Sequence, residues 1–221
     1  MTAPQTNRPQ VDKSHYAFGK YAFEGRFVSY YWQLKEVLAL NPGSVLEAGA
    51  GDRVFGNFIK DNTAVAYTCV DIAEDLRPDV VGSVLALPFR DKSHDVVCAF
   101  EVLEHLPFEQ FDKAMSELAR VARTHVVISI PHFGPTLSFS LKIPFITQIR
   151  FAFKIPFPKR HVFNGQHYWE LGKKGYPASL IRQKLARRGH IVRDFVPFGN
   201  QYHHFFVVAV SALDKKQESL V

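Results

Sequence analysis

Hydrophobic and polar positions follow two different periods along this chain. Apolar residues that recur every three or four positions predict amphipathic helices, which cover residues 26–40, 53–60, 108–123 and 177–188. Short continuous apolar runs are typical of buried strands, and these cover residues 44–48, 64–70, 79–81, 95–100, 125–130, 190–196 and 203–210. Strands that alternate with helices form a parallel sheet with helices on both faces. The pattern therefore predicts a doubly wound α/β fold with a mostly parallel, seven-stranded sheet.

The last two predicted strands are separated by Pro197-Phe198-Gly199-Asn200, a sequence typical of a turn. Two strands joined so closely pair in antiparallel orientation. We expect this hairpin to add one antiparallel strand at the edge of the sheet.

The length of 221 residues is enough for one domain with a single core. We expect this domain over residues 15–213, between a polar, disordered tail at 1–14 and a second tail at 214–221. No run of 18 apolar residues occurs, and the first fourteen residues contain no stretch that resembles a signal peptide. A soluble, cytoplasmic protein is the expectation.

Cys69 and Cys98 both lie in predicted buried strands, where a free thiol acts as a small hydrophobic group. Such thiols are typical of a reducing compartment, which agrees with the cytoplasm. Two isolated cysteines also argue against a structural zinc site, and we expect no metal.

A glycine turn gives the first indication of chemistry. The strand at 44–48 contains Glu47 and leads into Gly49 and Gly51, and the next strand is followed by Asp71. Glycine lets the backbone approach a ligand closely, and an acidic residue about 20 positions later is placed to bind the hydroxyls of a ribose. The spacing predicts a nucleoside-containing cofactor, although a simple strand-to-helix turn is the alternative explanation for the glycines alone.

Two features favour S-adenosylmethionine (SAM) over a dinucleotide. Val54 stands where a dinucleotide-binding turn has its third glycine. The negative charge of Glu47 would repel a pyrophosphate but suits a cationic ligand, and SAM carries an ammonium and a sulfonium.

Four motifs together resemble the class I SAM-dependent methyltransferases, in particular the small-molecule group known as methyltransferase type 11 or UbiE-like. They are Val-Leu-Glu-Ala-Gly-Ala-Gly-Asp (45–52), Val-Asp-Ile (70–72), Leu-Ala-Leu-Pro-Phe (85–89) and Asp-Val-Val-Cys-Ala-Phe-Glu-Val-Leu-Glu-His-Leu (95–106). The resemblance covers about residues 44–131 and implies the Rossmann-like methyltransferase fold.

The resemblance also implies roles for matched positions in cofactor binding. Glu47, Gly49 and Gly51 would lie beneath the methionine part of SAM. Asp71 would bind the ribose hydroxyls, and Ile72 would pack on the adenine.

Recognition of the adenine amino group departs from the family pattern. Ser83 stands where the family often has an aspartate, and a hydroxyl binds more weakly than a carboxylate. Backbone groups of Val84 and Leu85 could take over part of this recognition. Arg53 replaces a small residue of the family's turn, which leaves the local shape of the loop open.

A further candidate cofactor-binding residue, Glu101, and the candidate catalytic residues follow the fourth and fifth predicted strands, at the carboxyl edge of the sheet where ligands bind. Glu101 could face SAM or the substrate, or it could stabilise the start of the next turn. His105 and His132 are the candidates for a general base, because an imidazole suits proton transfer at neutral pH. Structural roles are the alternative for both histidines.

Residues 133–163 carry most of the net charge of +6. The segment contains five Lys and Arg residues, seven phenylalanines and no Asp or Glu, and its prolines exclude one long helix. We expect two short helical or extended pieces that lie over the mouth of the cofactor site. Basic and aromatic residues in one segment suit a membrane surface or a lipid-like acceptor, and less so a nucleic acid. A solvated cap that completes the core is the alternative.

An aromatic N-terminal segment at 15–40 could act as a helical lid over SAM.

The sequence thus favours a SAM-dependent methyltransferase with a small or lipid-like acceptor. An RNA or DNA methyltransferase and a SAM-binding regulatory protein without turnover remain the alternatives. The Asn-Pro-Pro-Tyr motif of base methylation is absent, which makes nucleic acid the less favoured acceptor.

Overall fold

The computed structural model describes residues 13–210. The helices are α1 (Glu24–Leu38), α2 (Val54–Asn62), α3 (Phe111–Val121) and α4 (Ala178–Ala186), and short 3-10 helices are η1 (Lys13–Tyr16), η2 (Glu74–Leu76), η3 (Leu103–His105) and η4 (Phe108–Gln110). The strands are β1 (Ser44–Ala48), β2 (Ala66–Asp71), β3 (Val80–Val81), β4 (His94–Phe100), β5 (Ala122–Pro131), β6 (Thr136–Leu141), β7 (Ile149–Lys154), β8 (His190–Phe195) and β9 (His203–Ala209).

Seven of these strands form one sheet in the order β3-β2-β1-β4-β5-β9-β8. β1 to β5 are parallel, and β9 runs antiparallel to both β5 and β8. The mostly parallel, seven-stranded sheet of the sequence prediction is confirmed. The antiparallel strand, however, lies inside the sheet rather than at its edge, because β9 inserts between β5 and β8 and pairs with both.

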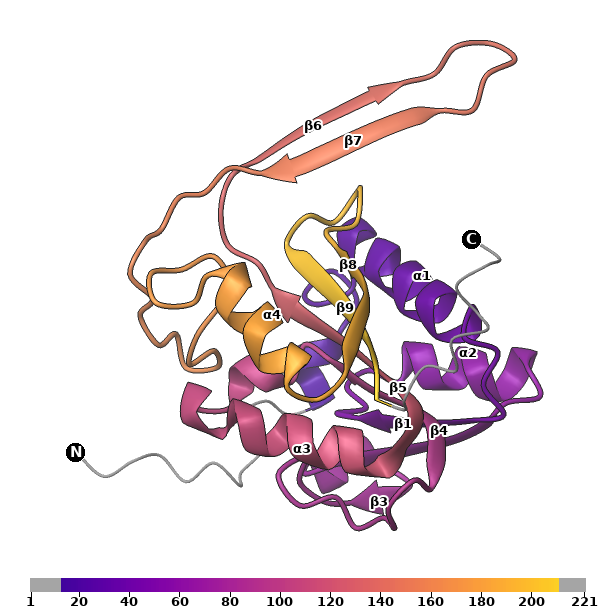
Figure 1. Cartoon of the computed structure of the whole chain (residues 1–221). Helices are drawn as coiled ribbons and strands as arrows, with labels where there is room; N and C mark the ends of the chain where they lie inside the picture. Colours follow the sequence, from indigo (N-terminus) through magenta and orange to yellow (C-terminus); the bar gives the residue numbers. More distant parts are fainter. Residues whose placement is uncertain (1–12, 211–221) are drawn as a thin grey trace.

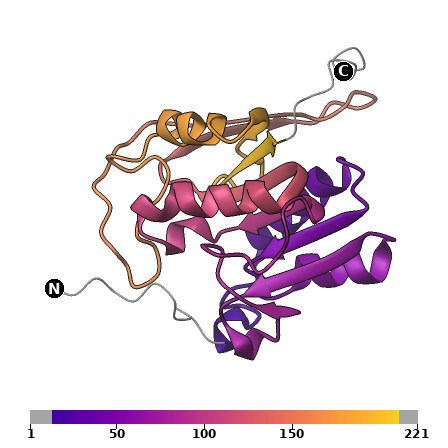
Figure 2. The ribbon, with the colours of Figure 1, turned by 60° about the horizontal axis from the view of Figure 1, so that its bottom comes forward.

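Side chains along each strand alternate between two apolar layers. In β4, Val97 and Ala99 pack with α3 and α4, whereas Val96 and Cys98 pack with α1 and α2. This period of two is expected for a sheet that is covered on both faces. The result is a three-layer α/β/α domain, with α3 and α4 on one face and α1 and α2 on the other (Figures 1 and 2).

Two further strands, β6 and β7, form a separate antiparallel hairpin within the segment 133–163. The hairpin projects from the body of the domain (Figure 1). Of the two forms that we expected for the two short pieces, helical or extended, the structure has the extended one. The expectation that the segment lies over the cofactor site is addressed below.

The expected tails lie mostly outside the described residues, at 1–12 and 214–221. Positions 13 and 14, which we assigned to the first tail, belong to η1. Cys69 and Cys98 are free and buried. Among the described residues, no helix has the length and apolar character to cross a membrane.

Candidate functional site

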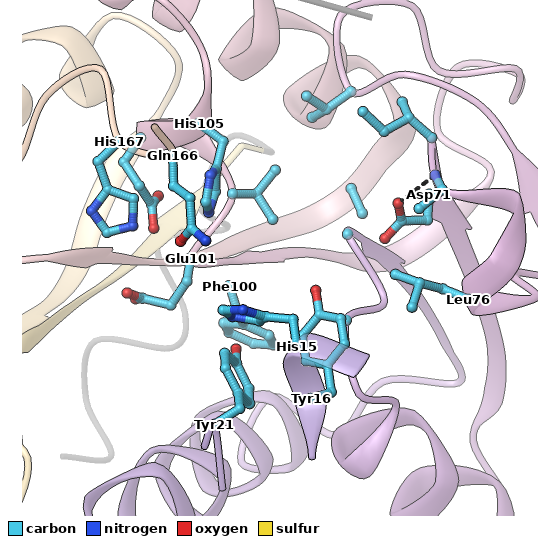
Figure 3. Close-up of a pocket in the computed structure, with 18 of the residues that line it drawn as sticks. His15, Tyr16, Tyr21, Asp71, Leu76, Phe100, Glu101, His105, Gln166 and His167 are labelled. Carbon is cyan, nitrogen blue, oxygen red and sulfur yellow. Dashed lines mark hydrogen bonds between the residues drawn. The ribbon is translucent and has the colours of Figure 1, made fainter. Parts of the chain in front are cut away.

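A cavity of about 390 Å³ lies at the carboxyl edge of the sheet, between the segments that follow β1, β2 and β4. The strand order reverses between β1 and β4, and ligands of open α/β sheets bind at such a point. The volume is in the range of small-molecule sites. Figure 3 shows the side chains that surround this cavity.

The glycine turn after β1 forms one wall of the cavity. Gly49 has φ +85° and Gly51 has φ +50°, conformations that glycine adopts without strain. A Cβ atom on Gly49 would overlap the Cγ2 atom of Val102, which follows β4. The turn therefore needs glycine at position 49 for two reasons, its backbone angle and the close approach of the neighbouring segment.

Asp71 follows β2 and reaches back to the glycine turn. Figure 3 shows Asp71 beside the cavity. Its Oδ2 accepts a hydrogen bond of 2.9 Å from the Ala50 amide, and its Oδ1 accepts one of 2.9 Å from the Ala73 amide. Each carboxylate oxygen can accept more than one hydrogen bond. Burial raises the pKa of Asp71, although its backbone hydrogen bonds lower it in part. Asp71 is thus held rigidly and keeps acceptor capacity toward the cavity.

Glu47 does not line the cavity. Its side chain is 4% exposed and accepts a hydrogen bond from the hydroxyl of Tyr67 on β2. Burial raises the pKa of Glu47 to about 8. A side chain at Gly56 on α2 would overlap the Tyr67 hydroxyl, so this glycine makes room for the contact. Glu47 consequently supports the glycine turn from behind.

The remaining positions expected near the adenine lie on two loops. Ile72, Ser83 and Val84 line the cavity, whereas Leu85 packs against the core. The Ser83 hydroxyl accepts a hydrogen bond of 3.2 Å from the Leu85 amide and so stabilises its own loop.

The N-terminal segment supplies an aromatic wall opposite the sheet. His15, Tyr16 and Tyr21 line the cavity, and Tyr16 lies within van der Waals distance of a Cβ position at Gly51 (Figure 3). The guanidinium of Arg26 stacks on the Tyr21 ring at 4.2 Å. Burial raises the pKa of Tyr16 to about 12. The sequence indicated this wall only through its aromatic composition.

Ionisable side chains gather at the other end of the cavity. Glu101 follows β4 with φ +55°, an uncommon conformation for a residue with a side chain. Its Oε2 lies 3.2 Å from His203 Nε2, and His203 Nδ1 lies 2.7 Å from the Ser29 hydroxyl. Burial raises the pKa of Glu101 to about 7. Backbone strain of this kind is concentrated at functional sites.

Glu104 and His105 on η3 and His167 on a distant loop complete this end. The His105 and His167 rings meet edge to face at 5.1 Å (Figure 3). Burial lowers the pKa of His105 to about 4, so its imidazole is neutral at pH 7. Our sequence reasoning missed Glu104 as a site residue, although it lies within the Glu-His-Leu motif.

Comparison with known proteins gives the family of the segment that contains β1, β2 and β4. Residues 46–130 match a family model described as a methyltransferase domain. Residues 46–130 form a class I SAM-dependent methyltransferase domain. No curated protein matches the sequence.

Solved structures support the fold of this methyltransferase. The magnesium protoporphyrin IX methyltransferase of Synechocystis, solved with bound S-adenosylhomocysteine, is similar with a TM-score of 0.61 at 16% identity, over 90% of this chain and 92% of that one. The 1,6-didemethyltoxoflavin-N1-methyltransferase of Burkholderia thailandensis gives a TM-score of 0.54 at 14% identity, over 86% and 87%. A SAM-dependent methyltransferase of Clostridium acetobutylicum gives 0.57 at 7% identity, over 90% and 96%. At such identities the likeness shows the fold.

The cavity of the methyltransferase fits SAM. The bare backbone at Gly49 leaves space that a Cβ would fill, and Asp71 offers acceptor oxygens one strand away. Aromatic rings of Tyr16, Tyr21 and Phe100 line the same space, and such rings attract a sulfonium. SAM is therefore the cofactor of this methyltransferase.

His132, the other candidate base, lies outside the cofactor cavity. Its ring stacks on His204, with the two Nδ1 atoms 2.9 Å apart, and His204 Nε2 lies 2.6 Å from Asp194. Burial lowers the pKa of His132 to about 3. His132 instead lines a second cavity together with Lys154.

The basic aromatic segment does not cover the cofactor site, so this expectation was wrong. No residue of 133–163 lines the cofactor cavity, which is closed instead by the N-terminal aromatics. The physical reason is that β6 and β7 pair with each other and direct the segment away from the sheet edge.

Proposed function

We propose that this methyltransferase transfers the methyl group of SAM to a small amphipathic acceptor that it takes from an anionic membrane surface. The proposal is carried by the β6–β7 hairpin, which presents an apolar face that no core covers. Two of the similar structures named above, the protoporphyrin and the didemethyltoxoflavin methyltransferases, act on small molecules, which agrees with a small-molecule acceptor.

The hairpin is amphipathic because of its register. Leu137 pairs with Phe153, Phe139 pairs with Phe151, and Leu141 pairs with Ile149. Side chains of paired residues lie on the same face, so these three pairs form one continuous apolar face. All six side chains are between 41% and 57% exposed.

The opposite face of the hairpin is polar and basic. Its pairs are Thr136 with Lys154, Ser138 with Ala152, and Ser140 with Arg150. The connecting loop adds Lys142 and the fully exposed Phe145. A large apolar patch rimmed by cations, with no carboxylate in the segment, matches the headgroup boundary of an anionic membrane.

A neighbouring groove extends this surface toward the body of the domain. Phe27 and Tyr31 on α1 are more than half exposed, and together with Phe151 they line a cavity between the hairpin and α1. A two-stranded hairpin by itself is marginally stable in water. Insertion into lipid would stabilise its apolar face.

The cavity that His132 lines adjoins both the base of the hairpin and the cofactor cavity. It is lined by Thr136 and Lys154 at the base of the hairpin, and it shares Phe23 and Tyr202 with the cofactor cavity. Burial lowers the pKa of Lys154 to about 8. We infer that an amphipathic acceptor passes along this route, with an anionic group near Lys154 and His132.

Within the cofactor cavity the residues divide the work. Bound SAM supplies an activated methyl group. Asp71 holds the ribose, Ile72 and Ser83 flank the adenine, and residues 15–31 form a lid that excludes water. Glu101 takes the proton of an acceptor hydroxyl, because it lines the cavity and its pKa of about 7 suits a base at neutral pH.

Three binding measurements test the proposal. Calorimetry should show binding of SAM and no binding of NAD. Vesicles that contain phosphatidylserine should bind the protein, whereas neutral vesicles should bind it weakly. Salt-sensitive binding of oligonucleotides without vesicle binding would refute the lipid-like acceptor and favour a nucleic acid.

A further inference from the structure

Three side chains at the end of the cofactor cavity have the composition of a metal site. Glu104, His105 and His167 each offer one ligand atom, and these atoms lie within 4.8 Å of one another. Glu104 and His105 come from η3, whereas His167 comes from the loop before α4, so the fold brings them together. We propose that these residues bind a divalent transition-metal ion of the Zn²⁺ type.

Glu104 gives the first independent reason. Its side chain is 0% exposed, it lines the cavity, and neither carboxylate oxygen has a hydrogen-bond partner. Burial of an ionised carboxylate without partners costs several kcal/mol. A proton or a cation must therefore satisfy this group. A neutral imidazole has one N–H, and His105 and His167 each make a hydrogen bond to another group. Their remaining ring nitrogens can ligate a metal ion beside Glu104.

The surroundings of the two histidines give the second reason. His167 Nδ1 lies 3.1 Å from the Oε1 atom of the buried Glu170, which leaves Nε2 as the ligand atom. A histidine that binds a metal usually donates its other ring N–H to a carboxylate or a carbonyl in this way. His105 makes a hydrogen bond with the backbone of Gln166, which would orient it similarly. Both ligands thus have the supporting contacts of a built site.

The donor set selects the kind of ion. Two imidazole nitrogens and one carboxylate oxygen suit zinc and its neighbours, whereas magnesium and calcium prefer oxygen ligands alone. Three protein ligands also leave an open coordination position toward the cavity. This position would bind an oxygen of the acceptor, a role that rests on the proposed function, whereas binding of the ion does not. The expectation of no metal rested on the cysteines and did not consider this nitrogen and oxygen site.

Metal binding to the tag-free chain tests the proposal directly. After treatment with EDTA and dialysis, calorimetry with Zn²⁺ should show one ion per chain. Glu104→Gln and His167→Gln should each weaken binding at least tenfold. The exposed Glu109→Gln and His190→Gln are matched controls and should bind Zn²⁺ like the wild type. With Co²⁺ as the probe, the wild type should develop a visible absorption band that both ligand variants lose.

Affinity for S-adenosylhomocysteine separates the possible failures. A variant that still binds this product is folded, so its loss of Zn²⁺ reports on the ligand itself. If Glu104→Gln fails to fold, two other variants give the same test. These are His167→Gln at the half-buried ligand and Glu170→Gln at its partner. Equal Zn²⁺ affinity in the wild type and the ligand variants, or no binding to the wild type, would overturn the metal site and leave the methyltransferase proposal intact.

Discussion

Replacing the central cross-strand pair of the hairpin is the sharpest test of membrane binding. Phe139 and Phe151 are 56% and 57% exposed and lie opposite each other on the apolar face. A phenylalanine presents about 200 Å² of surface, so roughly 110 Å² of each ring would leave water on insertion. At about 25 cal/mol per Å² this transfer contributes roughly 2–3 kcal/mol per ring. Each Phe→Ser substitution should therefore weaken vesicle binding at least tenfold.

Flotation of the protein with vesicles that contain phosphatidylserine measures this loss. The matched control is Phe58→Ser on α2, which removes a ring that is 43% exposed but lies outside the hairpin. Thermal unfolding should be nearly unchanged in all three variants, because these rings pack against no core. Equal flotation of the hairpin variants and the Phe58 variant would refute the reasoning.

Three further predictions concern the cofactor cavity and the residue behind its glycine turn. Asp71→Ala should weaken SAM binding by roughly 1.5–3 kcal/mol in calorimetry, whereas Ala at the exposed Glu74 should not, and equal affinity would exclude the ribose contact. The kcat/KM of the wild type should rise with pH through the pKa of Glu101, about 7, because the base acts when it is ionised. Glu101→Gln should lower kcat/KM by about 10²- to 10⁴-fold and abolish this rise. Glu47 binds its proton up to about pH 8 when folded but only to about 4.5 when unfolded, so folding stability should fall as pH rises through this window. Glu47→Gln should remove that fall, and parallel Tm curves for variant and wild type would contradict it.

The parts of the site that follow directly from strand ends could be predicted from the sequence. The glycine turn and Asp71 lie at the carboxyl ends of adjacent strands, and parallel strands bring such ends to one edge. Their positions depend on the register of β1 and β2 alone. Ser83 and Val84 follow from the next strand by the same rule.

Residues whose role depends on side-chain direction could not be placed in this way. Ile128 and Ile130 pack in the layer of α3 and α4, and the period of two puts His132 on the same side, away from the cofactor cavity. The motif also gave no sign that Glu47 would bond to Tyr67, because that contact needs a neighbouring strand and a glycine on α2.

The hairpin shows how composition can hide a pattern. Large apolar residues alternate with polar ones at Leu137, Phe139 and Leu141, and large apolar residues again stand at every second position at Ile149, Phe151 and Phe153. This is the period of a strand with one buried face. The prolines around both runs drew attention to broken helices, although they lie outside the paired residues and only bound the two strands.

Several features that are unfavourable in the chain alone lie along one route. The apolar face of the hairpin lacks a core, Lys154 at its base is half-buried and donates only to the backbone carbonyls of His132 and Gly134, and Glu104 is a fully buried carboxylate in the cofactor cavity. Each of these costs folding free energy in the chain alone, since exposed apolar area and buried unpaired charge are both unfavourable. The two apolar layers around the sheet, by contrast, bury their side chains against one another. A lipid surface would cover the apolar face of the hairpin, and an anionic headgroup would lie near Lys154. Further along the route, an acceptor hydroxyl would meet Glu101 and a metal ion would meet Glu104. A membrane-derived acceptor therefore explains these features together.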